Sequence, residues 1–191
     1  MTIRLWLVRH GSTEWSEAGR YTGSTDLQLS ERGKAEAGAL TWLADRSWTG
    51  VWTSDLKRAG DTARLAGMEA TPDRRLREID FGRLEGMTWA ELDRPTRDAL
   101  AAFDRFDAPG GESTGGLLTR LEGFIDDLPP GDHLAFTHGG VIRTLVRTTG
   151  ADRHLGPGEV AVLEIDGASR RDVSVDFLEK PVDSGRDRSS S

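Results

Sequence analysis

The sequence predicts an α/β domain in which strands and helices alternate along the chain. Short runs of strand-forming apolar residues are followed by segments with apolar residues at helical spacing, and glycines and prolines separate the two kinds of segment. The chain has 191 residues, which suits one domain of roughly 100–200 residues, and it contains no linker or internal repeat. We therefore predict a single domain over residues 1–182 and a polar, disordered tail over residues 183–191.

The first half of the chain predicts two strand–helix units. Residues 3–8 form a mostly apolar run that is typical of a buried first strand. Ser30 then stands where a helix cap is expected, before apolar residues at helical spacing. Residues 50–53 indicate a second strand, and Ser54 or Asp55 begins the helix that follows it.

The second half repeats this alternation and ends in two strands. Its predicted elements are a helical segment near 96–106, a helix capped by Ser113 and ended by Pro129-Pro130, a strand over 133–137, a helix after Gly139-Gly140, and closing strands over 160–165 and 173–177.

Composition excludes several classes of function. The chain has no cysteine, so disulfides, a thiolate nucleophile and cysteine-ligated metals are excluded. Its net charge of −7 disfavours nucleic acid and anionic membranes as partners. No apolar run approaches the roughly 20 residues of a membrane span, and the first residues lack the basic region and cleavage site of a signal peptide. We expect a soluble, cytoplasmic protein.

Three local patterns do not support the functions they suggest. Residues 111–115 match the G-x-S-x-G nucleophile elbow, but no strand precedes them, so Ser113 is better interpreted as a helix cap. Residues 80–82 spell the kinase D-F-G without the other kinase motifs. His133 and His138 are five residues apart on a predicted strand, which places them on opposite faces and argues against a shared metal ion. We predict no metal site.

One constellation does suggest chemistry. Arg9-His10-Gly11 directly follows the first strand, and Thr137-His138-Gly139-Gly140 repeats the order of strand, histidine, glycine and helix. Arg58 lies in the first turn of the helix after the second strand. Ligands of open α/β sheets gather at the carboxyl ends of strands, and glycines at a helix start leave backbone N–H groups free for an anion. Two histidines and two arginines at such positions predict a phosphate site.

These residues also carry a family resemblance. The motif L-V-R-H-G-S-T-E-W resembles the signature of the histidine phosphatase superfamily, the phosphoglycerate-mutase-like proteins. Further segments resemble that family's motifs in the family's order, and the match runs from residue 3 to about residue 150, which is most of the chain. They are residues 7–15, 22–33, 53–63, 76–86, 110–113 and 137–143.

The resemblance implies a three-layer αβα sandwich with a mixed, mostly parallel sheet of about six strands. It implies that His10 is the nucleophile and becomes a phosphohistidine, that Arg9, Arg58 and His138 hold the phosphoryl oxygens, and that Glu78 gives a proton to the leaving oxygen. No metal or cofactor is needed, because arginines, histidine and backbone amides can stabilise the charge on those oxygens. Glu85 is the alternative acid, and its other interpretation is a structural hydrogen-bonding group.

Departures from the mutases favour a phosphatase similar to the broad-specificity or α-ribazole phosphatases. Phosphoglycerate mutases have Tyr, Gln and Lys where this chain has Phe81, Glu85 and Trp89, so this loop lacks the lysine of the mutases and the site is expected to be more apolar. A phosphoglycerate mutase is the alternative enzyme, and a non-catalytic binding or regulatory protein is the alternative from another class.

The substrate is expected to be a small phosphorylated metabolite. The sequence leaves open both its identity and the choice between a monomer and a homodimer. Besides the phosphate-holding residues, the candidate contacts are Thr22, Gly23, Trp89, Ser113, Gly139 and Arg143.

Overall fold

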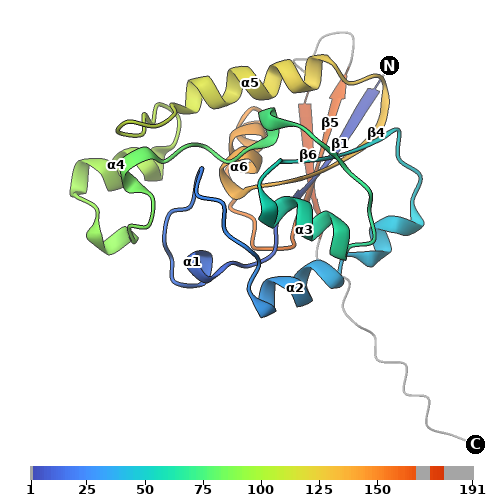
Figure 1. The fold of residues 1–191 in the computed structure, drawn as a ribbon. Helices are drawn as coiled ribbons and strands as arrows, with labels where there is room; N and C mark the ends of the chain where they lie inside the picture. Colours follow the sequence, from blue (N-terminus) through green and yellow to red (C-terminus); the bar gives the residue numbers. More distant parts are fainter. Residues whose placement is uncertain (1, 167–172, 179–191) are drawn as a thin grey trace, which may run out of the picture.

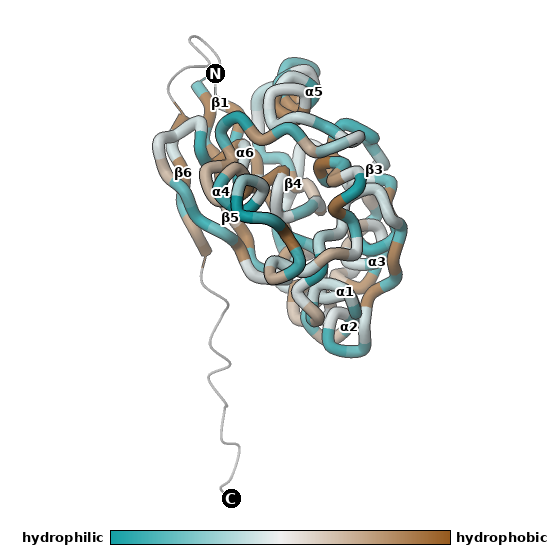
Figure 2. The backbone as a smooth tube through the Cα atoms, turned by 90° about the vertical axis from the view of Figure 1, so that its left-hand side faces the viewer, coloured by the Kyte–Doolittle hydropathy of each residue, from teal (hydrophilic) through white to brown (hydrophobic). Residues whose placement is uncertain are grey.

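The computed structural model describes residues 2–166 and 173–178 (Figure 1). A six-stranded sheet with the order β3-β2-β4-β1-β5-β6 forms its centre, and β3 and β6 lie on opposite sides of the molecule in Figure 2. The four strands from β3 to β1 are parallel, and the pairs β1–β5 and β5–β6 are antiparallel. The strands are β1 (Thr2–Arg9), β2 (Gly50–Thr53), β3 (Thr71–Pro72), β4 (Gly131–Thr137), β5 (Val160–Asp166) and β6 (Val173–Leu178).

Helices cover both faces of this sheet. They are α1 (Glu14–Glu17), α2 (Glu31–Gly38), α3 (Lys57–Leu65), α4 (Arg94–Ala102), α5 (Thr114–Asp126) and α6 (Gly139–Arg147), with 3₁₀ turns at Thr41–Asp45, Arg74–Leu76, Gly82–Leu84 and Trp89–Glu91. In Figure 1 α5 lies at the top and α2 at the bottom. Within the described ranges, no helix combines the length and the apolar character that a membrane span requires.

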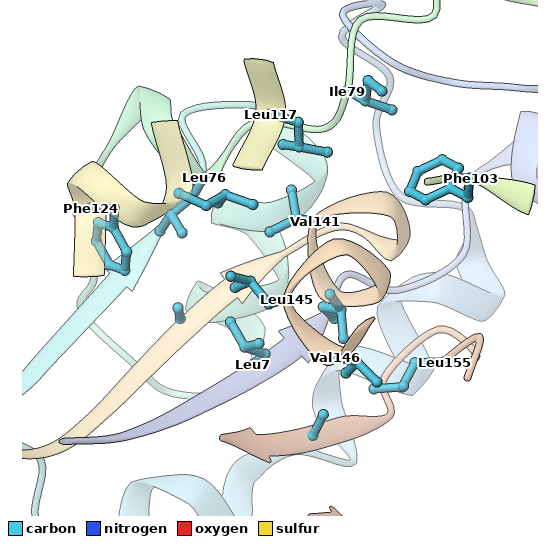
Figure 3. Packing of buried hydrophobic residues seen from close by; sticks show 14 of the residues in the cluster. Leu7, Leu76, Ile79, Phe103, Leu117, Phe124, Val141, Leu145, Val146 and Leu155 are labelled. Carbon is cyan, nitrogen blue, oxygen red and sulfur yellow. The ribbon is translucent and has the colours of Figure 1, made fainter. Parts of the chain in front are cut away.

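Alternation along β1 explains the layers. Leu5 and Leu7 are fully buried in a core that also contains the apolar residues of α5 and α6. Trp6 and Val8 point to the other face and pack with residues of α3 and of the 41–45 turn. The larger core is shown in Figure 3, where side chains of β1, α5 and α6 meet. The predicted three-layer αβα sandwich with a mixed, mostly parallel six-stranded sheet is therefore confirmed.

The predicted helix caps are present, whereas some boundaries differ. The Ser30 hydroxyl accepts from Gly33 N at 3.1 Å, and the Ser113 hydroxyl accepts from Gly116 N at 3.0 Å. Ser113 is thus a helix cap rather than a nucleophile on a strand–helix elbow. α4 ends at Ala102, before the predicted limit, because Phe103 takes a left-handed conformation with φ 56°. β3 escaped prediction because it has two residues, and its Pro72 lacks the N–H that a central strand needs.

The sheet brings the carboxyl ends of β1, β2 and β4 to the same edge. Arg9 of β1 is in register with Thr137 of β4, and Thr53 of β2 is in register with Phe136. The segments that follow these three strands therefore start side by side. The predicted tail over residues 183–191 lies outside the described residues, and the single-domain boundary at residue 182 stays a prediction.

Candidate active site

Two buried histidines meet at the ends of β1 and β4. His10 donates its backbone N–H to Thr137 O at 3.0 Å, which extends the strand pairing to the nucleophile candidate. The ring centroids of His10 and His138 are 5.1 Å apart. Only 6% of His10 and none of His138 is exposed. The adjacent parallel strands therefore produce the pair that the sequence predicted.

The hydrogen bonds of His10 fix its tautomer. Its Nδ1 lies 2.7 Å from Gly11 O, and a carbonyl can only accept, so Nδ1 carries the proton. Burial lowers the pKa of His10 well below its usual value, and the charges of Arg58 and Arg9 lower it further. The neutral ring therefore keeps a lone pair on Nε2, which is the atom that a nucleophilic histidine needs.

His138 carries its proton on the opposite ring nitrogen from His10. Arg58 Nε donates to His138 Nδ1 at 3.2 Å, and a guanidinium never accepts, so the proton of neutral His138 sits on Nε2. Burial, followed by the charge of Arg58, lowers the pKa of His138 well below its usual value. Its Nε2 is buried and has no hydrogen-bond partner in the structure. A buried, unpaired N–H beside the nucleophile is suited to an oxygen of a bound anion.

Arg58 is held by the protein itself. It is fully buried and donates Nη1 to Thr25 O at 2.9 Å and Nη2 to Gly23 O at 2.8 Å, in addition to its bond with His138. Three of the five guanidinium N–H groups are thus used internally. Arg58 and His138 lie beneath the cavity surface rather than on it. Burial lowers the pKa of Arg58, but an arginine keeps its charge.

Arg9 supplies a second cation, which is partly buried. Its Nη1 donates to Leu155 O, whereas its Nε is buried without a hydrogen-bond partner. Arg9 lines the cavity together with His10. Burial lowers its pKa, and Glu78 and Glu159 oppose that shift, so its charge is retained.

Glu78 lies across the same cavity and is only 9% exposed. Its Oε1 accepts from Ile79 N at 2.9 Å and its Oε2 accepts from Gly140 N at 3.0 Å. Burial raises the pKa of Glu78, although these two amides and the nearby arginines Arg58 and Arg9 act against the rise. A carboxyl group that stays protonated at higher pH than usual is suited to general acid catalysis.

Glu85 has a structural position. Its carboxylate accepts from Ser24 N at 2.6 Å, from Thr25 N at 2.9 Å and from the Thr25 hydroxyl. It therefore fixes the loop whose carbonyls orient Arg58, and it does not line the cavity. Of the two carboxyl groups that the sequence offered, the geometry favours Glu78 as the acid.

At two glycines, neighbouring atoms lie too close to leave room for a side chain. A Cβ on Gly11 would lie 2.3 Å from Gly33 O, so the loop after β1 can pack on the start of α2 only without a side chain. A Cβ on Gly140 would lie 2.4 Å from Glu78 Oε1, so the bond from Gly140 N to Glu78 also requires glycine. These contacts give a physical reason for R-H-G and H-G-G.

These groups line a cavity of about 610 Å³. We call the side formed by Arg9, His10, Glu78, Gly139 and Gly140 the polar end. The aromatic end is formed by Tyr21, Phe81, Trp89, Leu100 and Phe103. The cavity thus joins a charged, buried site to an apolar wall.

Ring contacts build the aromatic end. Tyr21 and Phe81 have centroids 5.2 Å apart, whereas Trp89 is 45% exposed. Phe103 stacks on Phe106 at 6.3 Å, and the Arg143 guanidinium lies 4.7 Å from the Phe103 ring. The left-handed backbone of Phe103 costs roughly 1–2 kcal/mol in a residue with a Cβ, and these contacts offset that cost.

Arg143 lines the cavity but is already paired. It donates to Asp152 through Nε at 2.9 Å, and to the carbonyls of Leu100 and Ala101 at 3.2 Å and 2.8 Å. Its side chain therefore holds the end of α4 and supports Phe103. This pairing leaves the arginine poorly available for a substrate carboxylate.

Of the other residues predicted to contact the substrate, some line the cavity and some do not. Thr22 and Gly139 line the cavity, as do Trp89 and Arg143. Gly23 is buried and presents its carbonyl to Arg58, and Ser113 caps α5. Sequence reasoning missed Arg20, Tyr21, Phe103 and His154, which also line the cavity. Arg20 and Tyr21 directly precede a family-like motif, and this position was the only sequence signal that could have pointed to them. The places of Phe103 and His154 along the cavity depend on the fold alone.

Comparison with known proteins decides the family. The model of the histidine phosphatase superfamily, branch 1, matches residues 5–174. The chain belongs to this superfamily. Its relatives include both phosphatases and phosphoglycerate mutase-like proteins, so it is an enzyme-family member whose reaction type has to be argued from the site.

Three similar proteins illustrate this range. Glucosyl-3-phosphoglycerate phosphatase of Mycobacterium tuberculosis is 33% identical over 74% of this chain and 73% of that protein. Metal-independent phosphoserine phosphatase of Arabidopsis thaliana is 33% identical over 73% of this chain, which spans about two thirds (65%) of the plant protein. The crystal structure of a phosphoglycerate mutase from Thermus thermophilus is 40% identical, covers 92% of this chain and 98% of that one, and superposes with a TM-score of 0.81.

Proposed function

We propose that the chain is a metal-independent phosphomonoesterase that transfers a phosphoryl group from a small phosphorylated metabolite to His10 and then to water. The observation that carries the proposal is the proton arrangement of the two histidines. Nδ1 of His10 is bound to Gly11 O, which leaves Nε2 as the nucleophile, while His138 carries its proton on an unpartnered Nε2. One ring is arranged to attack and the other to donate.

The first step forms the phosphohistidine. His10 Nε2 attacks phosphorus, the bond from phosphorus to the ester oxygen breaks, and the Glu78 proton passes to that oxygen to release the alcohol. Arg9, Arg58 and the N–H of His138 stabilise the charge on the phosphoryl oxygens, and Gly139 at the start of α6 lies at the same end. The raised pKa of the buried Glu78 keeps the proton available.

The second step regenerates the enzyme. Glu78, now a carboxylate, takes a proton from water as the water oxygen attacks phosphorus. The bond between phosphorus and Nε2 breaks, and inorganic phosphate leaves with His10 neutral again. Acid–base assistance of this kind is typically worth roughly 10²–10⁴-fold in rate.

The aromatic end supports a phosphatase over a mutase. A mutase must grip a carboxylate-bearing substrate. Of the arginines that line the cavity besides Arg9, Arg143 is paired with Asp152 and Arg20 donates to Gly86 O, and Trp89 lines the same cavity. The solved structure from Thermus thermophilus that is titled a phosphoglycerate mutase keeps the mutase as the second candidate. The two functions share the first step and differ in the acceptor of the phosphoryl group.

One set of assays separates the candidates. We expect p-nitrophenyl phosphate hydrolysis that survives excess EDTA and releases inorganic phosphate. The second assay supplies 3-phosphoglycerate with 2,3-bisphosphoglycerate; formation of 2-phosphoglycerate without phosphate release would identify a mutase. Loss of hydrolysis in EDTA would contradict a metal-independent mechanism, and inactivity in both assays would favour a non-catalytic binding protein.

A further inference from the structure

Arg120 of α5 reaches the backbone that carries Glu78, although it lies outside the cavity. Its Nη2 donates to Glu78 O at 3.1 Å, and its Nη1 donates to Arg75 O. The side chain is only 21% exposed. A single guanidinium therefore connects α5 to two carbonyls of the segment that leads into the acid.

Glu112 holds Arg120 in this orientation. Its two carboxylate oxygens accept from Arg120 Nε at 2.7 Å and from Nη2 at 2.9 Å, which is the bidentate geometry of a strong arginine–carboxylate pair. The same residue binds the far side of the acid segment, because Glu112 N donates to Asp80 O at 2.8 Å. A Cβ on Gly111 would lie 2.2 Å from Asp80 O, so the two segments are in close contact.

We propose that Arg120 and Glu112 form a positioning pair that holds the Glu78 carboxyl group where it can pass its proton to the leaving oxygen. The pair fixes the main chain before Glu78 at Arg75 O, at Glu78 itself, and after it at Asp80. The carboxyl group then needs only its bonds to Ile79 N and Gly140 N to be oriented.

The pair acts through the backbone rather than on substrate. Neither Arg120 nor Glu112 lines the cavity, and the guanidinium of Arg120 donates its hydrogen bonds to two carbonyls and a carboxylate. Displacement of a catalytic group by about 1 Å can cost roughly 10²-fold in rate. The inference rests on the proposed function, because a proton is needed only when a poor leaving group departs.

The test compares two esters that differ in this need. 2-Phenylethyl phosphate releases an alkoxide and requires the proton, whereas p-nitrophenyl phosphate releases a stable phenolate and does not. The ratio kcat/KM reports the phosphorylation step alone, because hydrolysis of the phosphohistidine is common to both esters and follows it. For Arg120→Gln we expect kcat/KM on 2-phenylethyl phosphate to fall about tenfold or more, and kcat/KM on p-nitrophenyl phosphate to fall less than about threefold. Inhibition by inorganic phosphate should change little, because the polar end is intact.

A matched control excludes a general loss of stability. Arg75→Gln removes an arginine from the same region that pairs with Asp73 and Asp127, but that does not bind Glu78 O through its side chain. It should lower the thermal midpoint without changing the ratio of the two kcat/KM values. Should Arg120→Gln fail to fold, Glu112→Gln replaces it and should show the same selective loss, a few-fold smaller.

The outcomes separate this inference from the proposed function. Equal losses of kcat/KM on the two esters, or an unchanged kcat/KM on 2-phenylethyl phosphate in the folded variants, would overturn the positioning role while the phosphatase stands. Absence of hydrolysis of both esters by the unchanged protein would overturn the proposed function, and with it the role of the pair.

Discussion

The two ends of the cavity are held in place by different interactions. At the polar end, the side chains of His10 and Glu78 are tied to the main chain through Gly11 O, Ile79 N and Gly140 N. At the aromatic end, Tyr21 and Phe81 meet through ring contact, and Trp89 is about half exposed at 45%. Backbone bonds fix geometry more strictly than apolar packing, which tolerates exchange of similar side chains.

This difference suggests a division of labour. The polar end would keep one reaction, because the side chains of His10 and Glu78 depend on main-chain contacts, two of which are made by glycines. The aromatic end would set which ester is accepted, because its side chains can change without disturbing those contacts. Two relatives whose names give different substrates, phosphoserine and glucosyl-3-phosphoglycerate, agree with such a division.

The most severe disruption of the polar end is removal of the nucleophile. His10→Ala should lower kcat on p-nitrophenyl phosphate by about 10⁴-fold or more, because no other described group takes over the attack. His133→Gln is the matched control. His133 is equally buried, but its ring contacts Trp52 and Pro129 O, so activity should persist. Near-full activity of His10→Ala would disprove the assignment.

Removing the proton tests the acid separately from the nucleophile. Glu78→Gln keeps the shape of the side chain and should lower kcat on 2-phenylethyl phosphate by roughly 10²–10⁴-fold. The loss on p-nitrophenyl phosphate should be much smaller for the phosphorylation step, which pre-steady-state release of p-nitrophenol measures. Comparable losses in that step on both esters would remove Glu78 from the acid role, and Glu85→Gln would then be examined.

The polar end should also make stability depend on pH. The folded-state pKa of His10 lies well below its usual value because of burial and then Arg58 and Arg9. As pH falls below about 6.5, the unfolded chain binds a proton that the folded chain does not, so acid destabilises the fold.

His10→Asn removes this titration. The loss of unfolding free energy between pH 7.5 and pH 5 should then be smaller by up to about 2 kcal/mol. Urea denaturation of both proteins at the two pH values measures it. Identical losses would mean that His10 is protonated in the folded protein.

The smallest expected effect lies at the aromatic end. Trp89→Ala should raise KM for 2-phenylethyl phosphate about fivefold to tenfold by removing an aromatic contact, and leave glycerol 1-phosphate nearly unaffected. Both esters release an alkoxide, so their difference reports binding rather than leaving-group chemistry. Trp89→Phe should restore most of the preference. Equal changes for both esters would contradict a substrate-selecting role.

Much of the polar end was predictable from sequence. Arg9, His10 and His138 follow directly from two strands, so their neighbourhood needs only the parallel pairing of those strands. Arg58 follows from the next strand–helix unit. The sequence could not show that Arg58 is wholly buried, or that it donates hydrogen bonds to the carbonyls of Gly23 and Thr25. Those bonds depend on the conformation of a loop.

The aromatic end and the positioning pair of Arg120 and Glu112 were harder to predict from the sequence. Tyr21, Phe81 and Phe103 come from segments without regular periodicity, and Phe103 reaches the cavity only through a left-handed turn. Arg120 and Glu78 are 42 residues apart in the sequence. The apolar spacing of the helix that carries Arg120 predicts which face is buried, but not what its polar side chains bind. Long-range polar contacts of this kind leave no local pattern. The described fold otherwise follows the predicted alternation of strands and helices.

The covalent phosphohistidine intermediate is the central feature of the proposed mechanism. The most direct measurement is rapid acid-free quenching of the enzyme during turnover of p-nitrophenyl phosphate, followed by peptide mass spectrometry that locates the phosphoryl group. We expect an acid-labile, base-stable phosphoryl group on Nε2 of His10, absent from His10→Ala. A phosphoryl group on another residue, or turnover that never labels His10, would contradict the mechanism.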